Sequence, residues 1–156
     1  MPNDTESIPH GLGQLRSWIA DGWRPPMAET LDIRLVEADN GRAVFTGTPG
    51  ERVYNPLGMV HGGYATTMLD SACGCAVHSS LAEHQTYTTL ELKVAFLRAL
   101  RWNTGPVRAE AKVVSIGRRV AFAEARLTDA NGALYATATS TLLVMDLEAP
   151  HGAAAR

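Results

Sequence analysis

Apolar and polar residues alternate along two parts of the chain, and a segment with a different pattern separates them. The first alternating part covers about residues 31–48, and the second covers about residues 89–145. Asn40-Gly41 and Asn131-Gly132 interrupt the alternation and are typical of hairpin turns. Because alternation puts apolar side chains on one face of a strand and polar side chains on the other, we expect about six strands in an antiparallel sheet with one buried face.

The segment between these parts, residues 61–80, repeats its apolar residues at helical spacing. Apolar side chains surround nearly the whole helix, as in a buried helix. A short amphipathic helix is also predicted over residues 12–20, and Pro25-Pro26 should end it. The order of elements favours an α+β fold, in which a curved antiparallel sheet wraps around one long buried helix. The expected divisions are an N-terminal tail with the short helix, a main domain and a flexible C-terminal tail (residues 1–24, 25–146 and 147–156).

Composition and charge limit the classes of partner. The chain has 156 residues, 46% of them hydrophobic and 19% charged, which suits one globular domain. The formal net charge of −2 argues against a nucleic-acid-binding surface. No secretory signal or membrane-spanning stretch is visible, and Cys73 and Cys75 would point apart on a helix, so we expect a reduced, cytoplasmic protein without a membrane partner. The histidines lack metal-ligand spacing, so we expect no metal site.

Asp70 is the one carboxylate inside the predicted buried helix. Residues one helical turn away from it, such as Thr66, Thr67 and Gly74, cannot neutralise its charge. Burying an unpaired charge costs several kcal/mol, so a core helix should exclude it unless the site is hydrated or functional. The alternative is that this side of the helix simply faces solvent. The narrow polar stripe favours a functional role for Asp70.

The predicted helix begins at two glycines, Gly62 and Gly63, which leave the backbone N–H groups unshielded. Such N–H groups can stabilise the negative charge that develops on a carbonyl oxygen under attack. Asp70 lies about 12 Å further along the helix axis, at about 1.5 Å per residue, whereas both groups must come within about 3 Å of one carbonyl. Two antiparallel helices from two copies of the chain would solve this problem, which predicts a site shared across a dimer.

Three segments carry a resemblance to a known family. The run NPLGMVHGGYATTMLDSACGCAV (residues 55–77) resembles the signature of the hotdog-fold acyl-CoA thioesterases, in the branch of the PaaI-like and 4-hydroxybenzoyl-CoA thioesterases. The later runs TTLELKVAFLRAL and SIGRRVAFAEARLTDANGALYATATSTLLV are also similar, so the resemblance extends over about residues 26–145. It implies hydrolysis of an acyl- or aryl-CoA thioester by a homodimer with shared active sites, arranged as a dimer of dimers. No cofactor is implied, because CoA is part of the substrate.

The resemblance also implies roles for individual residues. Asp70 would be the catalytic carboxylate, and the N–H of Gly62 would polarise the thioester carbonyl. His61 would orient the loop or touch the thioester, and Asn55 would hold the attacking water or the acyl group. Substrate-binding positions would be Gly63, Thr88, Thr89, Arg118 and Arg119, with Arg98 and Arg101 as weaker candidates for the CoA phosphates. Relatives often carry Ser or Thr where this chain has Gly74, and Thr88 or Thr89 is expected to supply that hydroxyl instead.

Two other functions remain open at this stage. A hotdog dehydratase or hydratase of 3-hydroxyacyl thioesters would use a histidine with a carboxylate, and His61 with Asp70 supplies such a pair. A non-catalytic module that binds acyl-CoA would need neither residue for chemistry. No G-x-S-x-G motif is present, which argues against a serine hydrolase.

Overall fold

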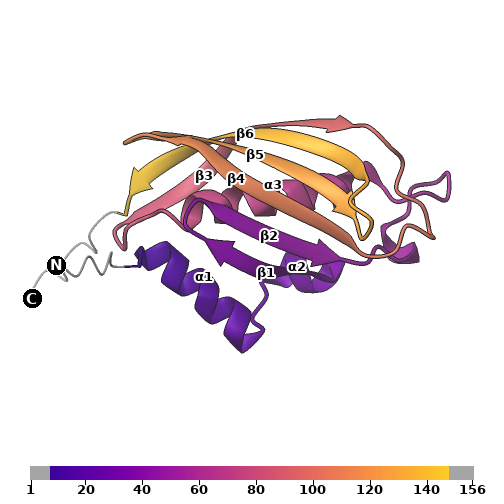
Figure 1. Cartoon of the computed structure of the whole chain (residues 1–156), viewed down its shortest axis with the longest axis horizontal. Coiled ribbons are helices and arrows are strands. Elements are labelled where there is room, and N and C mark those ends of the chain that lie inside the picture. The colour runs from indigo at the N-terminus through magenta and orange to yellow at the C-terminus, as the bar shows by residue number, and fades with distance from the viewer. Residues whose placement is uncertain (1–7, 148–156) are drawn as a thin grey trace, which may run out of the picture.

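The computed structural model describes residues 8–147, and within them a curved antiparallel sheet of six strands surrounds one long helix (Figure 1). The predicted tails fall largely on residues 1–7 and 148–156, which lie outside the described residues. No helix within residues 8–147 combines the length and apolar character that a membrane crossing requires. The elements in chain order are α1 (His10–Asp21), α2 (Pro26–Leu31), β1 (Ile33–Asp39), β2 (Arg42–Gly47), the 3-10 helix η1 (Glu51–Val53), α3 (Gly62–His78), β3 (Gln85–Phe96), β4 (Val107–Ile116), β5 (Val120–Asp129) and β6 (Leu134–Asp146).

The strands lie in the order β1-β2-β4-β5-β6-β3, and each neighbouring pair is antiparallel. The predicted sheet and its central helix are therefore confirmed. Register shifts interrupt the pairing near Leu35, Thr89 and Val113. Such bulges bend strands and increase their twist, which helps the sheet to curve around α3. One edge strand, β1, packs against α1 and α2, while β3 forms the opposite edge.

Small side chains on the inner face of the sheet allow α3 to approach closely. Seven alanines of β4, β5 and β6 are buried on this face: Ala109, Ala111, Ala121, Ala123, Ala125, Ala136 and Ala138. Larger side chains of α3, including Met68, Leu69 and Val77, are completely buried against them. The opposite side of α3 is only partly covered, since Thr66, Thr67, Asp70 and Ser71 are half-buried. The helix is thus buried on one side and has an open face, in contrast to the expected all-round burial.

The region after α1 differs from the sequence prediction. α1 ends at Asp21 and is capped by Gly22 in the left-handed conformation (φ 66°), so Pro25-Pro26 does not end it. Pro26 instead begins α2, because proline is well tolerated at the first helical position, where the N–H has no partner. Leu31 therefore ends a helix, and the first strand begins only at Ile33. β3 also starts earlier than expected, at Gln85.

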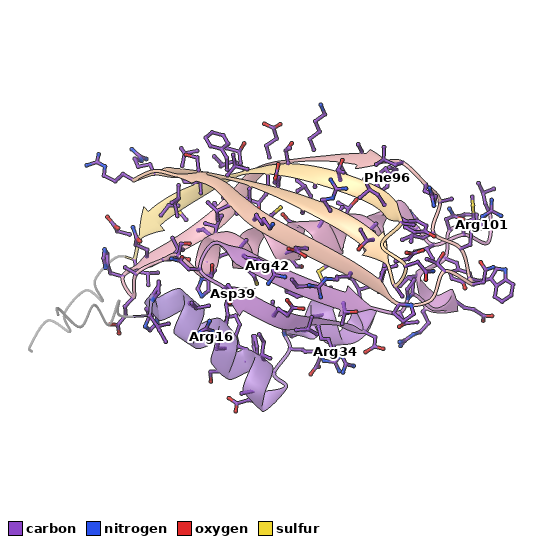
Figure 2. All side chains as sticks on the ribbon, in the orientation of Figure 1. Arg16, Arg34, Asp39, Arg42, Phe96 and Arg101 are labelled. Carbon is purple, nitrogen blue, oxygen red and sulfur yellow. The ribbon has the colours of Figure 1, made fainter. Side chains whose placement is uncertain are left out.

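Ion pairs connect β1, β2 and β4 on the outer face of the sheet, where Arg42 and Asp39 lie close together (Figure 2). Glu37 accepts from Arg108 at 2.7 Å and from Arg42 at 2.8 Å, and Arg42 also binds Glu110 at 2.9 Å. The hydrogen bonds from Arg108 and Arg42 lower the pKa of Glu37 to about 2. Because the side chain of Glu37 is 43% exposed, solvent screening limits its contribution to stability to about 1 kcal/mol.

This lowered pKa predicts a pH-dependent contribution to stability. A carboxylate with a depressed folded-state pKa stabilises the fold above its unfolded-state pKa, here near 4.5, and loses this effect as the pH falls towards 2. Glu37→Gln should therefore lower the free energy of unfolding by about 1 kcal/mol at neutral pH, and the difference from the wild type should shrink below pH 4.5. Urea denaturation across this range measures both values. A difference that stays constant with pH would contradict the role of the carboxylate charge.

Candidate active site

The loop before α3 and the first turn of the helix present one free backbone donor. His61 is the N-cap residue, and its Nδ1 atom accepts from the N–H of Gly63 at 2.8 Å. This bond occupies the amide of Gly63, which was expected to face substrate. The N–H of Gly62 forms no hydrogen bond with another described residue. Of the two glycine amides, Gly62 is therefore the one available to a ligand, and His61 fixes the helix start that presents it.

Asn55 holds the loop that leads into α3. Its Oδ1 atom accepts from the N–H groups of Leu57 at 2.9 Å and Met59 at 3.1 Å, and its own N–H donates to the carbonyl of Met59. The side-chain oxygen of Asn55 is therefore occupied by hydrogen bonds within a local turn. The side-chain amide nitrogen forms no hydrogen bond with a described residue, so this is the group of Asn55 that can reach a water molecule or a ligand.

Asn55, His61 and Gly62 line one cavity of about 330 Å³ at the start of α3. Its other walls come from the end of β3 and the following segment, including Phe96 and Arg98. Phe96, labelled in Figure 2, is 57% exposed, and its ring lies so close to Gly62 that an added Cβ would be 3.1 Å from it. Three predicted site residues thus meet at one cavity, and Asp70 is not among the residues that line it.

Asp70 lies on the open face of α3 and contacts β3. Its Oδ1 atom accepts from the hydroxyl of Thr89 at 3.1 Å, and no cation pairs with it among the described residues. Thr88, the neighbouring residue, is exposed and forms no side-chain hydrogen bond with the described part of the chain. Of the two threonines that the sequence left open, Thr89 is the one whose hydroxyl reaches Asp70.

Tyr87 occupies the space next to Gly74, one helical turn after Asp70. A Cβ at position 74 would lie 2.7 Å from the Tyr87 hydroxyl and 3.0 Å from Cε2, so glycine is needed for this ring to lie against α3. Burial, with smaller effects from Cys75 and Asp70, raises the pKa of Tyr87, so its hydroxyl stays protonated. Sequence reasoning missed Tyr87, although its position two residues before Thr89 places both side chains on the same face of one strand.

The predicted phosphate ligands lie far from Gly62 of the same chain. Arg118 and Arg119 are exposed in the turn between β4 and β5. This turn is level with Thr88, because Val120 pairs with Leu143 and Leu143 pairs with Thr88. Phe96, which contacts Gly62, is at the other end of β3, about 26 Å away at about 3.3 Å per residue. One chain therefore does not bring the arginine pair, Asp70 and Gly62 together.

The cysteines are poor candidates for chemistry. Burial raises the pKa of both Cys73 and Cys75 to about 12, so neither thiol forms the reactive thiolate at neutral pH. Both are free thiols, as expected from their spacing on the helix. Among residues 8–147, no group of three or more His, Cys, Asp or Glu side chains is arranged to hold a metal ion.

Comparisons with known proteins agree with this architecture. Residues 57–136 match the family model of the thioesterase superfamily. The 1,4-dihydroxy-2-naphthoyl-CoA hydrolase of Listeria monocytogenes is 26% identical over 118 residues, which cover 76% of this chain and 94% of that protein. A thioesterase family protein from Silicibacter pomeroyi is 29% identical with a TM-score of 0.76, covering 87% of this chain and 98% of that one.

A further solved structure supports the fold alone. The PaaI protein from the phenylacetic acid degradation operon of Escherichia coli is 21% identical with a TM-score of 0.77, and the match covers 89% of this chain and 96% of that one. The family match contains α3, with Gly62 and Asp70, and β3, whereas Asn55 lies just before the matched residues. The chain therefore belongs to the thioesterase superfamily and has the hotdog fold that its sequence predicted.

Proposed function

We propose that the protein is an acyl-CoA thioesterase that hydrolyses acyl- or aryl-CoA thioesters to the free acid and CoA. The carboxylate of Asp70 carries this proposal, because it is half-buried, has no cationic partner among the described residues and forms a single hydrogen bond, from Thr89. A carboxylate held in this way can attack the thioester carbonyl or activate a water molecule for the attack. If Asp70 attacks, a mixed anhydride forms as the C–S bond breaks, and water then hydrolyses it to the free acid and the Asp70 carboxylate. If Asp70 activates water, it takes the proton of the water whose oxygen bonds to the carbonyl carbon. In both routes the carbonyl oxygen gains negative charge before the C–S bond breaks, and CoA leaves as the thiolate. The residues supply this chemistry without a cofactor.

The free N–H of Gly62 is the donor proposed to stabilise the oxyanion. It stands at the start of α3, where the helix dipole adds to the positive potential. Asp70 of the same chain is about 12 Å further along the helix axis, so the proposed site combines Asp70 of one subunit with Gly62 of another. His61 positions this amide by accepting from Gly63, and the amide nitrogen of Asn55 lies at the same cavity.

The edge strand β3 is the surface proposed for dimerisation. It is 12 residues long, and no described strand pairs with its outer side. Natural proteins cover or interrupt long edge strands, and a second copy can do this by antiparallel pairing. Such pairing brings the start of one β3 towards the end of the other. The arrangement would move Arg118 and Arg119 of one subunit closer to the Gly62 cavity of its partner, where they could bind CoA phosphates.

The geometry of His61 favours hydrolysis over dehydration or hydration. An acid–base pair for a 3-hydroxyacyl thioester needs a histidine that exchanges protons with the substrate. Nδ1 of His61 already accepts from Gly63, so one ring nitrogen is committed to the helix cap. Aryl-CoA substrates are included in the proposal because the relative from Listeria monocytogenes is named for a naphthoyl-CoA.

A substrate panel tests the proposed reaction. We expect thiol release, detected with a thiol-reactive dye, from one or more of phenylacetyl-CoA, 4-hydroxybenzoyl-CoA and straight-chain acyl-CoA esters. Incubation with crotonyl-CoA should leave the enoyl absorbance unchanged except where the thioester itself is cleaved. Loss of that absorbance without thiol release would instead identify a hydratase. Saturable binding across the panel with no thiol release would identify a non-catalytic module.

A further inference from the structure

An apolar cavity of about 340 Å³ lies on the side of α3 away from the Gly62 cavity, between α1, α2 and the sheet. Aromatic side chains form much of its wall: Trp18, Trp23, Phe45 and Tyr87. Among residues 8–147, Arg24 is the one charged residue that lines it, and its guanidinium is paired with Asp32 at 2.9 Å. The lining thus suits an uncharged, apolar group and offers no free charge to a polar one.

Asp70 does not itself line the cavity, but residues near it on α3 and near its partner Thr89 on β3 do. On α3, Thr67 and Ser71 line the cavity, three residues before and one residue after Asp70. On β3, Tyr87 lines it and lies on the same face as Thr89, which donates to Asp70. A substrate whose thioester carbonyl is at Asp70 can therefore extend its acyl group over Thr67 and Ser71 into this space.

The aromatic side chains of the walls favour an aromatic ring. The rings of Trp18 and Trp23 are 4.7 Å apart, and Trp18 also stacks on His78, which in turn contacts Tyr87. Such rings attract another aromatic ring more than an alkyl chain of the same area. A cavity of about 150 Å³ is enough to hold benzene, so 340 Å³ has room for a substituted or two-ring group.

Two hydroxyl groups in the wall are able to bind substituents on that ring. Neither Ser71 nor Tyr87 forms a side-chain hydrogen bond with another described residue, and both line the cavity. A few placed polar groups in an apolar pocket commonly orient the ligand. We infer that this cavity receives the acyl part of the substrate and selects aromatic acyl groups over straight-chain ones. The inference rests on the proposed thioesterase function and narrows its substrate class.

Trp23 provides the test, since it is 50% exposed and its removal should leave the fold intact. We expect Trp23→Ala to lower kcat/KM for phenylacetyl-CoA by about tenfold and that for hexanoyl-CoA by a clearly smaller factor, so that the preference for the aromatic substrate falls. Trp102, which is 74% exposed and lines neither cavity, is the matched control, and Trp102→Ala should preserve both values. Met27→Ala on α2 is a second wall variant that should act in the same direction as Trp23→Ala.

Binding of a CoA thioether tests the cavity assignment independently of the proposed hydrolysis, because a thioether cannot be hydrolysed. Calorimetry should show that 2-phenylethyl-CoA binds the wild type and Trp102→Ala equally and Trp23→Ala about tenfold more weakly. Hexyl-CoA should bind the wild type and Trp102→Ala equally and Trp23→Ala more weakly by a clearly smaller factor. This pattern without any thiol release would support the cavity assignment and refute the hydrolysis. Two results would overturn the cavity assignment and leave the proposed hydrolysis standing. One is thiol release with the same substrate preference in the wild type and in Trp23→Ala. The other is equal affinity of these two proteins for 2-phenylethyl-CoA.

Discussion

Asp70→Asn should reduce thiol release from any accepted CoA ester by at least about a thousandfold. The amide that replaces the carboxylate is neither a nucleophile nor a base at neutral pH. It has the same size, and its oxygen can still accept from the hydroxyl of Thr89, as Oδ1 of Asp70 does at 3.1 Å. The substitution therefore removes the reactive group with little change to packing. Steady-state rates with a thiol-reactive dye measure the effect.

Binding and folding controls make this result specific. Asp70→Asn should bind 2-phenylethyl-CoA with an affinity close to that of the wild type, because the carboxylate acts on the reacting carbonyl rather than on CoA. Glu83→Gln changes an exposed carboxylate in the loop after α3 and should leave turnover unaltered. If Asp70→Asn kept more than about a tenth of the wild-type kcat, another group would have to perform the attack.

Much of the fold follows from local patterns in the sequence. Antiparallel pairing can be predicted from the alternation of apolar and polar residues along β4, β5 and β6 together with the Asn131-Gly132 turn. Each of these patterns is contained within a few consecutive residues. α2 escaped prediction because Pro25-Pro26 usually marks a break, and six residues are too few to show helical periodicity. Its end depends on Asp32 in the left-handed conformation (φ 52°), which is uncommon for a residue other than glycine.

The site was less predictable because its contacts join distant segments. Asp70 was identified from local pattern alone, but its contact with Thr89 depends on how β3 lies against α3. The fit of Tyr87 against Gly74 also crosses from strand to helix, so only the family resemblance drew attention to position 74, as a place where relatives often carry a hydroxyl. The bond from Gly63 to His61 could have been anticipated, since an acceptor at the N-cap commonly binds the second or third N–H of the helix.

Gly62→Pro should lower the rate of hydrolysis by at least about a hundredfold while leaving α3 in place. Proline has no N–H, so the substitution removes the proposed oxyanion donor, and the loss of one such donor lowers kcat by about 100- to 1,000-fold. Gly62 is the first residue of α3, where proline is well tolerated, and His61 already has the extended conformation that proline requires of its predecessor (φ −63°, ψ 136°). The nearest atoms to an added Cβ belong to the exposed ring of Phe96, which can move.

Gly62→Ala is the matched control, because it adds the same Cβ beside Phe96 and keeps the N–H. It should retain most of the wild-type activity, and circular dichroism should show equal helix content in both variants. If Gly62→Pro and Gly62→Ala had equal rates, the amide of Gly62 would have no part in the reaction.

Mixing the two inactive variants then determines whether the site is shared between subunits. In a heterodimer of Asp70→Asn and Gly62→Pro chains, one site would combine the intact Asp70 of one chain with the intact Gly62 of the other. Random exchange of subunits makes half of the dimers mixed, so about a quarter of the wild-type activity should return after unfolding and refolding the mixture. A site built within one chain would recover no activity, because every chain carries a defect. Recovery therefore requires that the 12 Å between Asp70 and Gly62 along α3 is bridged by a second copy.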